Sequence, residues 1–414
     1  MEFKEYKLSD LTINGKGEYG IGASAVEYNP SLYRYLRITD IDDNGFINTD
    51  ELKSVNDKNA ENYLLKENEI VFARTGNSTG KSYFYNGEDG PLVFAGFLIR
   101  FKLDSKKVNP KFIRYYTLSE NYKGWINQFA TGSTRKNINA KTYGNMIIKL
   151  PPRSYQNYIV QILDSLEEKL KENKKIITNL EELSQTLFTR WFVDFEFPDE
   201  NGNPYKSSGG EMVDSELGEI PKYWSIQTLN NISESYNTKR KPLSKLEREK
   251  VASIYPYYGA TKIIDYVDDY LFNGKFILVG EDGTVQTEEG HPFVQYVWGK
   301  FWVSNHAHIL KGNKLSDEIL MLILNNIDIE PYITGAVQPK ISKKNLNSIK
   351  VITGTKLIYE KFDQYIGVYY KKIREIRDEN NNLIQLRDTL LPKLMSGEIE
   401  IPDDIEVNED ELSI

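Results

Sequence analysis

The chain has 414 residues, of which 40% are hydrophobic and 27% are charged, and its formal net charge is −8. This composition is ordinary for a soluble globular protein, and the length allows two domains with connecting helices. The sequence contains no cysteine, which excludes disulfides and thiolate metal sites. No apolar run approaches the roughly 18 residues that a membrane span needs, and the first residues do not resemble a signal peptide. We therefore expect a cytoplasmic protein.

Residues 1–150 predict a first domain of mixed α/β structure. Short β-rich runs, at 69–73 and 91–101, are separated by turns that contain Gly, Asn and Asp. Asn109 followed by Pro110 predicts the start of a helix, because proline is favoured in the first helical turn. The sequence therefore predicts strands and short helices in alternation.

A second domain follows the same order. Residues 199–214 have the composition of a linker, and residues 215–352 then predict the second α/β domain. Strands are expected at 276–280 and 301–310. A helix is expected after Ser316, because a serine at that position suits an N-cap.

Charge is unevenly distributed along the chain. Between residues 100 and 149, eleven Lys or Arg residues stand against two acidic residues, Asp104 and Glu120. A second basic cluster lies within residues 239–250, whereas acidic residues gather in a C-terminal tail at 401–414. A basic face on an acidic protein is a surface suited to binding DNA phosphates. The alternative is an ordinary solvated surface, and charge alone does not decide between the two.

A long segment of the chain occurs twice. Thr131-Gly132 recurs as Thr334-Gly335, and the similarity continues without a gap to Leu187, which recurs as Leu390. Each copy contains a stretch that predicts a long helix, at 151–198 and at 353–400. The globular parts that precede the two copies resemble each other only in outline. We infer that one frame presents two different surfaces.

Apolar residues in each copy follow alternating steps of three and four, which is the seam pattern of a coiled coil. Such a stripe usually belongs to a protein core, but two seams with the same phase can also pair with each other. We therefore expect an α+β protein in which two α/β domains are separated by two long helices. These helices would form an intramolecular antiparallel coiled coil with pseudo-two-fold symmetry, each about 54 Å long if it spans 36 residues. The predicted seam residues are Ile159, Ile162, Leu166, Leu180, Leu183, Leu187, Phe362, Tyr365, Tyr369, Leu383, Leu386 and Leu390.

Three motifs resemble cofactor or metal sites incompletely. Residues 76–82 resemble a phosphate-binding loop, but Thr75 stands where the first glycine should be, and β-rich runs flank the motif. We interpret this segment as a loop able to meet DNA. The glycine-rich residues 15–22 lack the strand–turn–helix context of a dinucleotide fold. His306 and His308 share a strand face suited to metal ligation, but histidines satisfied within a sheet are the favoured interpretation.

The sequence contains no recognisable catalytic centre. A DNA methyltransferase would show an Asn- or Asp-Pro-Pro-aromatic tetrapeptide, whereas the adjacent prolines Pro151 and Pro152 follow Leu150. We find no paired carboxylates with a lysine that would hold Mg²⁺ for a nuclease, and no nucleophile elbow. We therefore expect a protein without catalytic residues or a bound metal.

Four segments, in order along the chain, carry a family resemblance. They are LPPRSYQNYIV at 150–160, LFTRWFVDFEF at 187–197, SELGEIPKYW at 215–224 and LRDTLLPKLMSGEI at 386–399. Together they resemble the specificity (S) subunit of type I restriction–modification systems, over nearly the whole chain and in the family's order. Tyr155 departs from the pattern, because an acidic residue commonly precedes the glutamine there.

The resemblance implies a function in host defence. Each α/β domain would be a target-recognition domain that reads one half of a bipartite, asymmetric site in double-stranded DNA, and the helix pair would set the spacer. Two methyltransferase (M) subunits would dock on this frame and transfer methyl groups from S-adenosylmethionine to adenine. Two restriction (R) subunits would add ATP-driven translocation and cleavage with Mg²⁺. The chain itself would carry no cofactor.

Residues that contact DNA are expected on loops and strand ends. Arg135 and Gln338 occupy equivalent positions in the two copies and suit base edges, whereas Lys136 and Lys340 suit phosphates. These loops could instead be turns that join each domain to its helix. The other expected DNA contacts, in the divergent parts, are Arg74, Lys81, Lys262, Gln286 and Asn305.

Two other functions remain open at this point. The chain could be a non-catalytic coiled-coil adaptor whose globular parts bind protein. It could also be the recognition half of a self-sufficient restriction enzyme with an unrecognised active site. Sequence-selective DNA binding would distinguish the specificity subunit from the adaptor, and methyl transfer by the isolated chain would support the enzyme.

Overall fold

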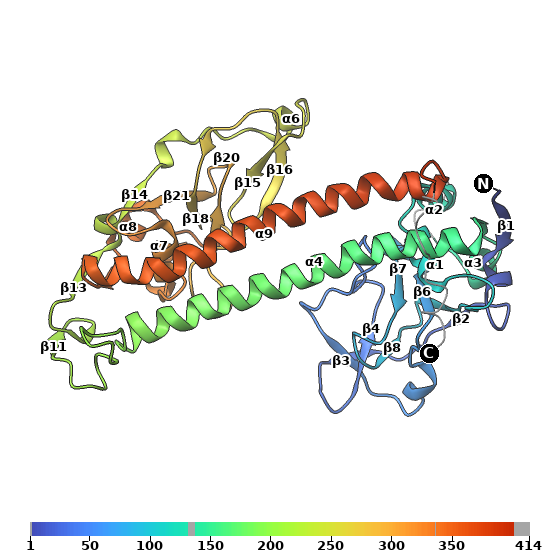
Figure 1. Cartoon of the computed structure of the whole chain (residues 1–414), viewed down its shortest axis with the longest axis horizontal. Coiled ribbons are helices and arrows are strands. Elements are labelled where there is room, and N and C mark those ends of the chain that lie inside the picture. The colour runs from blue at the N-terminus through green and yellow to red at the C-terminus, as the bar shows by residue number, and fades with distance from the viewer. Residues whose placement is uncertain (1, 131–136, 336, 401–414) are drawn as a thin grey trace. The chain divides into compact units, whose positions relative to one another are not determined.

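The computed structural model describes residues 2–130, 137–335 and 337–400, which form two compact units (Figure 1). The first unit comprises Met1–Glu172 and Glu379–Ile414, and the second unit comprises Asn173–Asp378. The predicted domain boundaries separated the globular domains from the helices. The compact units differ from this division, because each unit contains its own half of both long helices.

The described part of the first unit contains two four-stranded sheets and a two-stranded sheet. One four-stranded sheet is antiparallel throughout, and the other contains one parallel pair, β4 with β8. The antiparallel sheet has the order β2 (Glu18–Tyr19), β9 (Leu98–Lys102), β6 (Glu69–Ala73), β7 (Ser82–Tyr85). The mixed sheet has the order β3 (Ala25–Glu27), β5 (Lys53–Val55), β4 (Tyr33–Leu36), β8 (Leu92–Phe94), and β1 (Lys4–Lys7) pairs with β10 (Ile147–Leu150).

Short capped helices cover the first unit. The side chain of Asn109 accepts a hydrogen bond from the amide of Lys111, and Pro110 occupies the first turn, as the sequence predicts. Ser119 and Asn139 cap the next two helices in the same way. These helices are α1 (Pro110–Tyr116), α2 (Glu120–Asn127) and α3 (Ala140–Gly144), with 3₁₀ turns at Leu8–Leu11, Ala60–Tyr63, Gly76–Ser78 and Gln128–Ala130.

The second unit repeats this plan with different loops. Its sheets have the orders β14 (Ser233–Ser235), β21 (Ala307–Gly312), β18 (Phe276–Gly280), β19 (Val294–Val297), and β16 (Ile263–Val267), β15 (Tyr255–Tyr258), β20 (Lys300–Val303), β17 (Phe272–Asn273). The first of these is antiparallel, and the second contains the parallel pair β15 with β20. Two-stranded pairs join β13 (Ser225–Thr228) to β22 (Lys350–Thr353) and β11 (Met212–Ser215) to β12 (Gly218–Pro221).

Two of the predicted strands are broken in the structure. The run 91–101 forms β8 and β9 with a turn between them, and the run 301–310 contributes to β20 and β21. Ser316 caps its helix as expected, because its side chain accepts a hydrogen bond from the amide of Ile319. The helices of the second unit are α5 (Leu229–Ile232), α6 (Lys245–Arg248), α7 (Asp317–Leu324) and α8 (Lys343–Ser348), with 3₁₀ turns at Asn237–Lys239 and Glu330–Tyr332.

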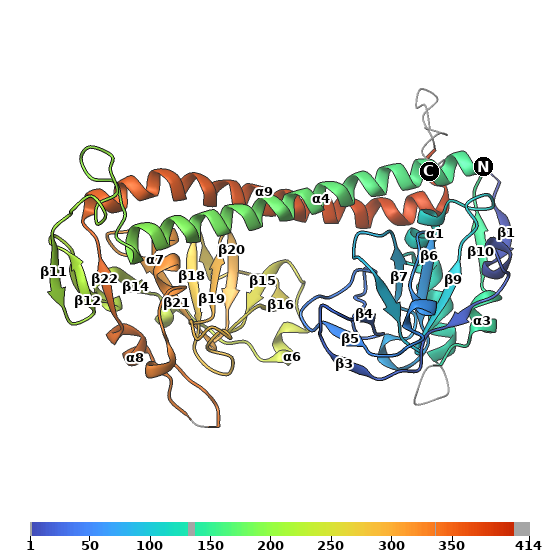
Figure 2. The ribbon, with the colours of Figure 1, turned by 90° about the horizontal axis from the view of Figure 1, so that it is seen from below.

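Two long helices, α4 (Arg153–Phe188) and α9 (Lys356–Ser396), run side by side in opposite directions within each unit (Figures 1 and 2). A π turn at Thr189–Val193 ends α4. In the first unit, the start of α4 packs with the end of α9 in one core that includes Ile159 and Leu394. In the second unit, the end of α4 packs with the start of α9 in a core that includes Phe188 and Phe362.

Some residues of the two long helices that the heptad pattern predicts to be buried are exposed. Ile159 and Phe362 are buried, but Leu183, Tyr365 and Leu386 are 47%, 49% and 46% exposed. The remaining predicted seam residues are half-buried, namely Ile162, Leu166, Leu180, Leu187, Tyr369, Leu383 and Leu390. The seam prediction is therefore wrong at Leu183, Tyr365 and Leu386.

The buried position is often the next residue along the helix. Leu163, Ser184 and Ile366 are fully buried, each one residue after a predicted seam position. A heptad seam assumes that a helix contacts one partner helix. Within each unit, the helix segments also pack on the globular part, as Ile366 of α9 shares a core with Leu320 of α7. The buried face is consequently rotated toward the globular part.

Charged side chains join each globular part to the helices. In the first unit, Arg114 of α1 forms an ion pair with Glu167 of α4 at 2.5 Å. In the second unit, Glu318 of α7 accepts hydrogen bonds from Lys275 at 2.7 Å and from Arg374 of α9 at 3.0 Å. The hydroxyl of Tyr296 also donates to Glu318, at 2.6 Å. These contacts fix each globular part on its segment of the helix pair.

Candidate nucleic-acid interface

Two backbone hydrogen bonds hold three loops together in the first unit. The amide of Arg74, the first residue after β6, donates to the carbonyl of Phe97 at 3.0 Å. The amide of Ile138 donates to the carbonyl of Arg74 at 2.8 Å. The loop after β6, the turn before β9 and the segment that leads to α3 are therefore fixed to one another.

The second unit contains the same arrangement. The amide of Glu281, the first residue after β18, donates to the carbonyl of His306 at 2.8 Å, and the amide of Ile341 donates to the carbonyl of Glu281 at 2.9 Å. We call this set of three loops the loop frame of each unit. Arg74 and Glu281 thus occupy equivalent positions, and so do Phe97 and His306.

The loop frame of the first unit contains two predicted DNA contacts. Arg74 is half-buried, and its guanidinium lies over the ring of Tyr19 at 4.9 Å from the centroid. Lys81 is half-buried and forms an ion pair with Asp43 at 3.0 Å. Arg135 and Lys136 lie outside the described residues. Of these two residues in the loop frame, Arg74 is therefore the one whose charged group forms no ion pair with the described residues.

The second unit brings several of its predicted DNA contacts to one end of the sheet. Lys340 forms isolated bridges with Asp282 and Thr334, which places its strand beside the loop after β18. Asn305 lies in the turn before β21, which belongs to the same loop frame. Gln338 is exposed in the loop that Lys340 closes. Three of the five predicted residues are thus close together.

The other two lie on neighbouring turns. Lys262 is exposed, and its carbonyl accepts a hydrogen bond from Gly259 in the turn between β15 and β16. Gln286 is exposed in the loop between β18 and β19 and forms an isolated bridge with Pro292. Both side chains are accessible, and Gln286 lies in the same loop after β18 that begins at Glu281.

Glu281 is the electrostatic centre of the second loop frame, and the sequence does not reveal its role. Its carboxylate binds Arg240 at 2.6 Å and lies 3.4 Å from the ammonium of Lys340. Burial alone would raise the pKa of the Glu281 carboxyl, but the hydrogen bond and charge of Arg240 and the charge of Lys340 hold it below its usual value. Arg240 also donates to the carbonyls of Asn305 and Ala307. Arg240 therefore ties the loops together rather than facing outward.

The two histidines predicted on one strand face make ordinary polar contacts, but only His308 lies on β21, because His306 belongs to the turn before it. His308 is buried, with one ring nitrogen bound to Asn237 and the other to the carbonyl of Ile341, both at 2.8 Å. Burial lowers the pKa of His308, so its neutral form is favoured. His306 binds Asp282 at 2.5 Å. Among the described residues, no group of three or more His, Cys, Asp or Glu side chains could hold a metal ion.

Most described cations of the basic run between residues 100 and 149 are paired with carboxylates. Nine of its eleven cations are described, and seven of these form ion pairs with carboxylates, most of them distant in the sequence. Arg114, for example, binds Glu167, and Arg100 binds Glu18 and Glu69. Folding neutralises most of this charge, so the number of basic residues overestimates the DNA-binding surface.

The phosphate-loop lookalike joins two strands of one sheet. Residues 74–81 connect β6 to β7 through a 3₁₀ turn and do not open a helix. Gly76 adopts a φ of +73°, which a glycine tolerates at low cost. The interpretation as a strand-to-strand loop agrees with this geometry.

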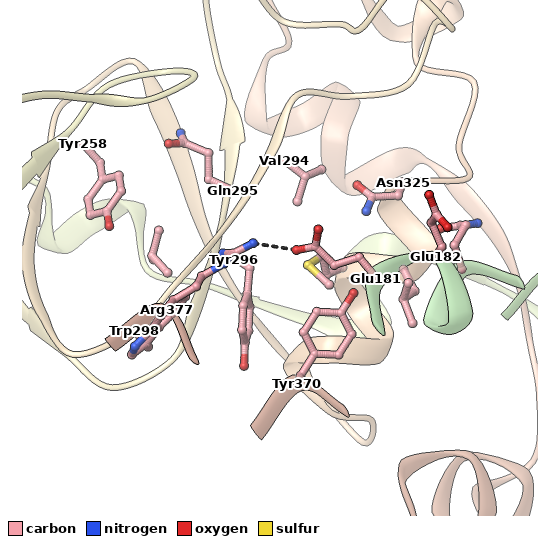
Figure 3. Close-up of a pocket in the computed structure, with 14 residues that line it drawn as sticks. Glu181, Glu182, Tyr258, Val294, Gln295, Tyr296, Trp298, Asn325, Tyr370 and Arg377 are labelled. Atoms are coloured by element: carbon pink, nitrogen blue, oxygen red, sulfur yellow. Dashed lines mark hydrogen bonds and ion pairs between the residues drawn. The ribbon is translucent and has the colours of Figure 1, made fainter. Parts of the chain in front are cut away.

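A cavity of about 670 Å³ lies in the second unit, between the helix pair and the sheet (Figure 3). Residues of α4, β19, α7 and α9 line it. Glu181 of α4 binds Arg377 of α9 at 2.5 Å on its wall, and Arg377 also lies over the ring of Trp298. The cavity therefore lies where the globular part of the second unit packs against the two long helices.

None of the described helices is long and apolar enough to cross a membrane.

Comparisons with known proteins agree with this architecture. A relative named as a putative type I restriction enzyme specificity subunit, from Haemophilus influenzae, is 36% identical over 124 residues, which cover 30% of this chain and 31% of the relative. The HindI specificity subunit of the same organism is 21% identical over 96% of this chain and all of the relative. A crystal structure of a type I restriction–modification system S subunit from M. genitalium has the same fold, with a TM-score of 0.58 at 17% identity over 95% of this chain and 96% of that one.

The family model described as the type I restriction modification DNA specificity domain matches residues 1–182 and 221–383. The two matches together cover most of the chain, one in each half. The chain belongs to the type I restriction modification DNA specificity family.

Proposed function

We propose that this chain is the DNA-recognition subunit of a type I restriction–modification complex, in which each globular part reads one half of a bipartite, asymmetric site. The observation that carries this proposal is the duplication. One specificity-domain match falls in each half of the chain, and both globular parts hold the same loop frame. The side chains on the two frames differ, as Arg74 and Glu281 illustrate, so the two parts are suited to different DNA sequences.

The chain selects the site and does not catalyse the reaction. Specificity subunits of this family are non-catalytic, and the chain itself carries no cofactor. We propose that S-adenosylmethionine binds to the methyltransferase subunits, and that ATP and Mg²⁺ serve the restriction subunits. The self-sufficient enzyme is therefore not favoured.

The partners are DNA and the other subunits of the complex, and we propose two M and two R subunits for each copy of this chain. The exposed seam residues Leu183 and Tyr365, in the second unit, and Leu386, in the first, support docking on the helix pair. Large apolar side chains on the open face of a helix pair are suited to contact with another protein. An adaptor that binds only protein would leave the two divergent loop frames without a role.

A salt-titrated binding series tests the proposal. The chain together with its M subunits is expected to bind DNA that contains its site at least about 10³-fold more tightly than unrelated DNA. Affinity for both DNAs should fall as salt rises, because phosphate contacts release counterions. The recognised site would first be identified from the methylated positions in the genome of the source cells.

The control is the M subunit without this chain, which should lose the preference for the site. Equal affinity of the complex for the site and for unrelated DNA at every salt concentration would contradict the proposed function. Methyl transfer by the isolated chain would contradict the non-catalytic role.

A further inference from the structure

We propose that Arg74 recognises a guanine in the half-site of the first unit, and that Tyr19 is the residue that positions it. This inference rests on the proposed function and adds the base and the side chains that read it. It is carried by the contacts of Arg74, by the way Tyr19 is held, and by the contrast with the second unit.

Among the described residues, the guanidinium of Arg74 has no partner of opposite charge. Four of the seven described arginines in the first unit form ion pairs with carboxylates, namely Arg37, Arg100, Arg114 and Arg387. Among the described residues, Arg74 forms no ion pair, and its buried Nε has no hydrogen-bond partner. An uncompensated guanidinium costs free energy unless a ligand supplies acceptors.

The ring of Tyr19 restrains this guanidinium in one place. The Cζ atom of Arg74 lies 4.9 Å from the centroid of the Tyr19 ring, within the range of a cation–π contact. Such stacking leaves the edge of the planar guanidinium able to form two parallel hydrogen bonds. The O6 and N7 acceptors of guanine, in the major groove, match that fork, and this is the commonest specific contact of arginine with DNA.

Tyr19 is itself fixed at both ends. Its backbone pairs with Ile99 in the antiparallel sheet, and its hydroxyl accepts a hydrogen bond from the amide of Ala140 at 3.1 Å. Ala140 begins α3, which follows the frame segment that contains Ile138. The ring is therefore fastened to two elements that also hold the loop frame, so Arg74 is preorganised before DNA binds.

The neighbouring glycine is required by this packing. A Cβ atom on Gly20 would lie 2.2 Å from the carbonyl oxygen of Ala95, in the turn that carries Phe97. That distance is far inside a van der Waals contact, so only glycine allows β2 to pass so close to the turn. The glycine-rich segment at residues 15–22 thus brings Tyr19 to the loop frame.

The equivalent position in the second unit has the opposite chemistry. Glu281 stands where Arg74 stands, and its carboxylate is occupied by Arg240 and Lys340. An acidic side chain with its own cations does not offer the donor fork that guanine needs. Guanine recognition by a frame arginine is therefore assigned to the first unit alone.

Binding to all single-base variants of the site, by the complex with M subunits, tests this assignment. The Arg74→Gln complex is expected to lose preference for guanine at one position in one half-site, by roughly 5- to 100-fold, and to keep the other preferences. Tyr19→Leu should weaken the same preference, whereas Tyr19→Phe, which keeps the ring, should retain most of it. Lys106→Gln is the matched control, because it removes one exposed positive charge away from the loop frame.

Replacing that guanine by 7-deazaguanine, which lacks the N7 acceptor, adds an atomic test. The wild-type complex should bind the modified site more weakly, and the Arg74→Gln complex should bind both sites equally. Melting temperatures of the variants should stay close to that of the wild type. An Arg74→Gln complex with the full wild-type base preference would overturn the inference, and so would an equal loss at every position. Failure of the wild-type complex to discriminate any base would instead overturn the proposed function.

Discussion

Replacing Glu318 with alanine is expected to lower the free energy of unfolding of the second unit by roughly 1–3 kcal/mol, because the partly buried Lys275 and Arg374 lose the acceptor that compensates their charges. Glu318 is 3% exposed and accepts hydrogen bonds from Lys275, Tyr296 and Arg374. Without the carboxylate, two cations remain at the joint between α7 and α9. Urea unfolding, followed by hydrogen exchange of the amides in the second unit, measures the loss.

Glu288→Ala is the matched control, since Glu288 is an exposed acidic residue of the same unit. Its effect should stay within about 0.5 kcal/mol, as for most surface substitutions. Equal stabilities of the Glu318→Ala and Glu288→Ala chains would contradict the assigned role of the joint.

The stability difference between the wild-type chain and Glu318→Ala depends on pH through the pKa of Glu318. Burial alone would raise that pKa, but the hydrogen bonds from Lys275 and Tyr296 outweigh burial and hold it below its ordinary value. A lowered carboxyl pKa contributes stability above the pKa of the unfolded chain, and that stability is lost as pH falls through the folded pKa. The difference between wild type and Glu318→Ala should therefore shrink in acid.

Replacing Phe362 with alanine is expected to cost about 3–5 kcal/mol, the range for a large aromatic side chain removed from a core. Phe362 is fully buried, and its ring contacts Phe188, Trp191 and Phe192. Leu183→Ala should cost less than about 1 kcal/mol, because Leu183 is half exposed and loses little buried area. Chemical denaturation of both variants gives the comparison.

The Phe362→Ala and Leu183→Ala variants distinguish the observed packing from a strict heptad seam. A heptad seam places Phe362 and Leu183 at equivalent buried positions, and predicts large losses for both. The structure predicts a large loss for Phe362 alone. Similar losses for the two variants would show that the helices pack as the heptad predicts.

The elements of the fold are largely predictable, because their signals are local. The caps at Asn109 and Ser316 mark helices that the structure contains, and the duplication predicts two long helices of equal phase. Which residues of the two long helices are buried is not predictable in the same way. Whether Tyr365 or Ile366 is buried depends on the globular part that packs against α9, and the periodicity of one helix contains no information about that partner.

The site is less predictable, because its contacts join residues far apart in the chain. The basic run at 100–149 loses most of its charge to carboxylates such as Glu167, which its own sequence window does not contain. The equivalence of Arg74 and Glu281 is also hidden, since loops of different length place them at a separation other than 203 residues. Tyr19 could have been suspected only from its position among glycines.

Exchange of one globular part, read by methylome sequencing, tests the central claim most directly. Residues 215–350 would be replaced by the matching segment of a relative that has a different site, in cells that supply the M subunits. We expect methylated sites in which one half-site has changed to that of the relative, while the other half-site and the spacer remain. A change in both half-sites, or in neither, by an active chimaera would contradict the claim that each globular part reads its own half of the site.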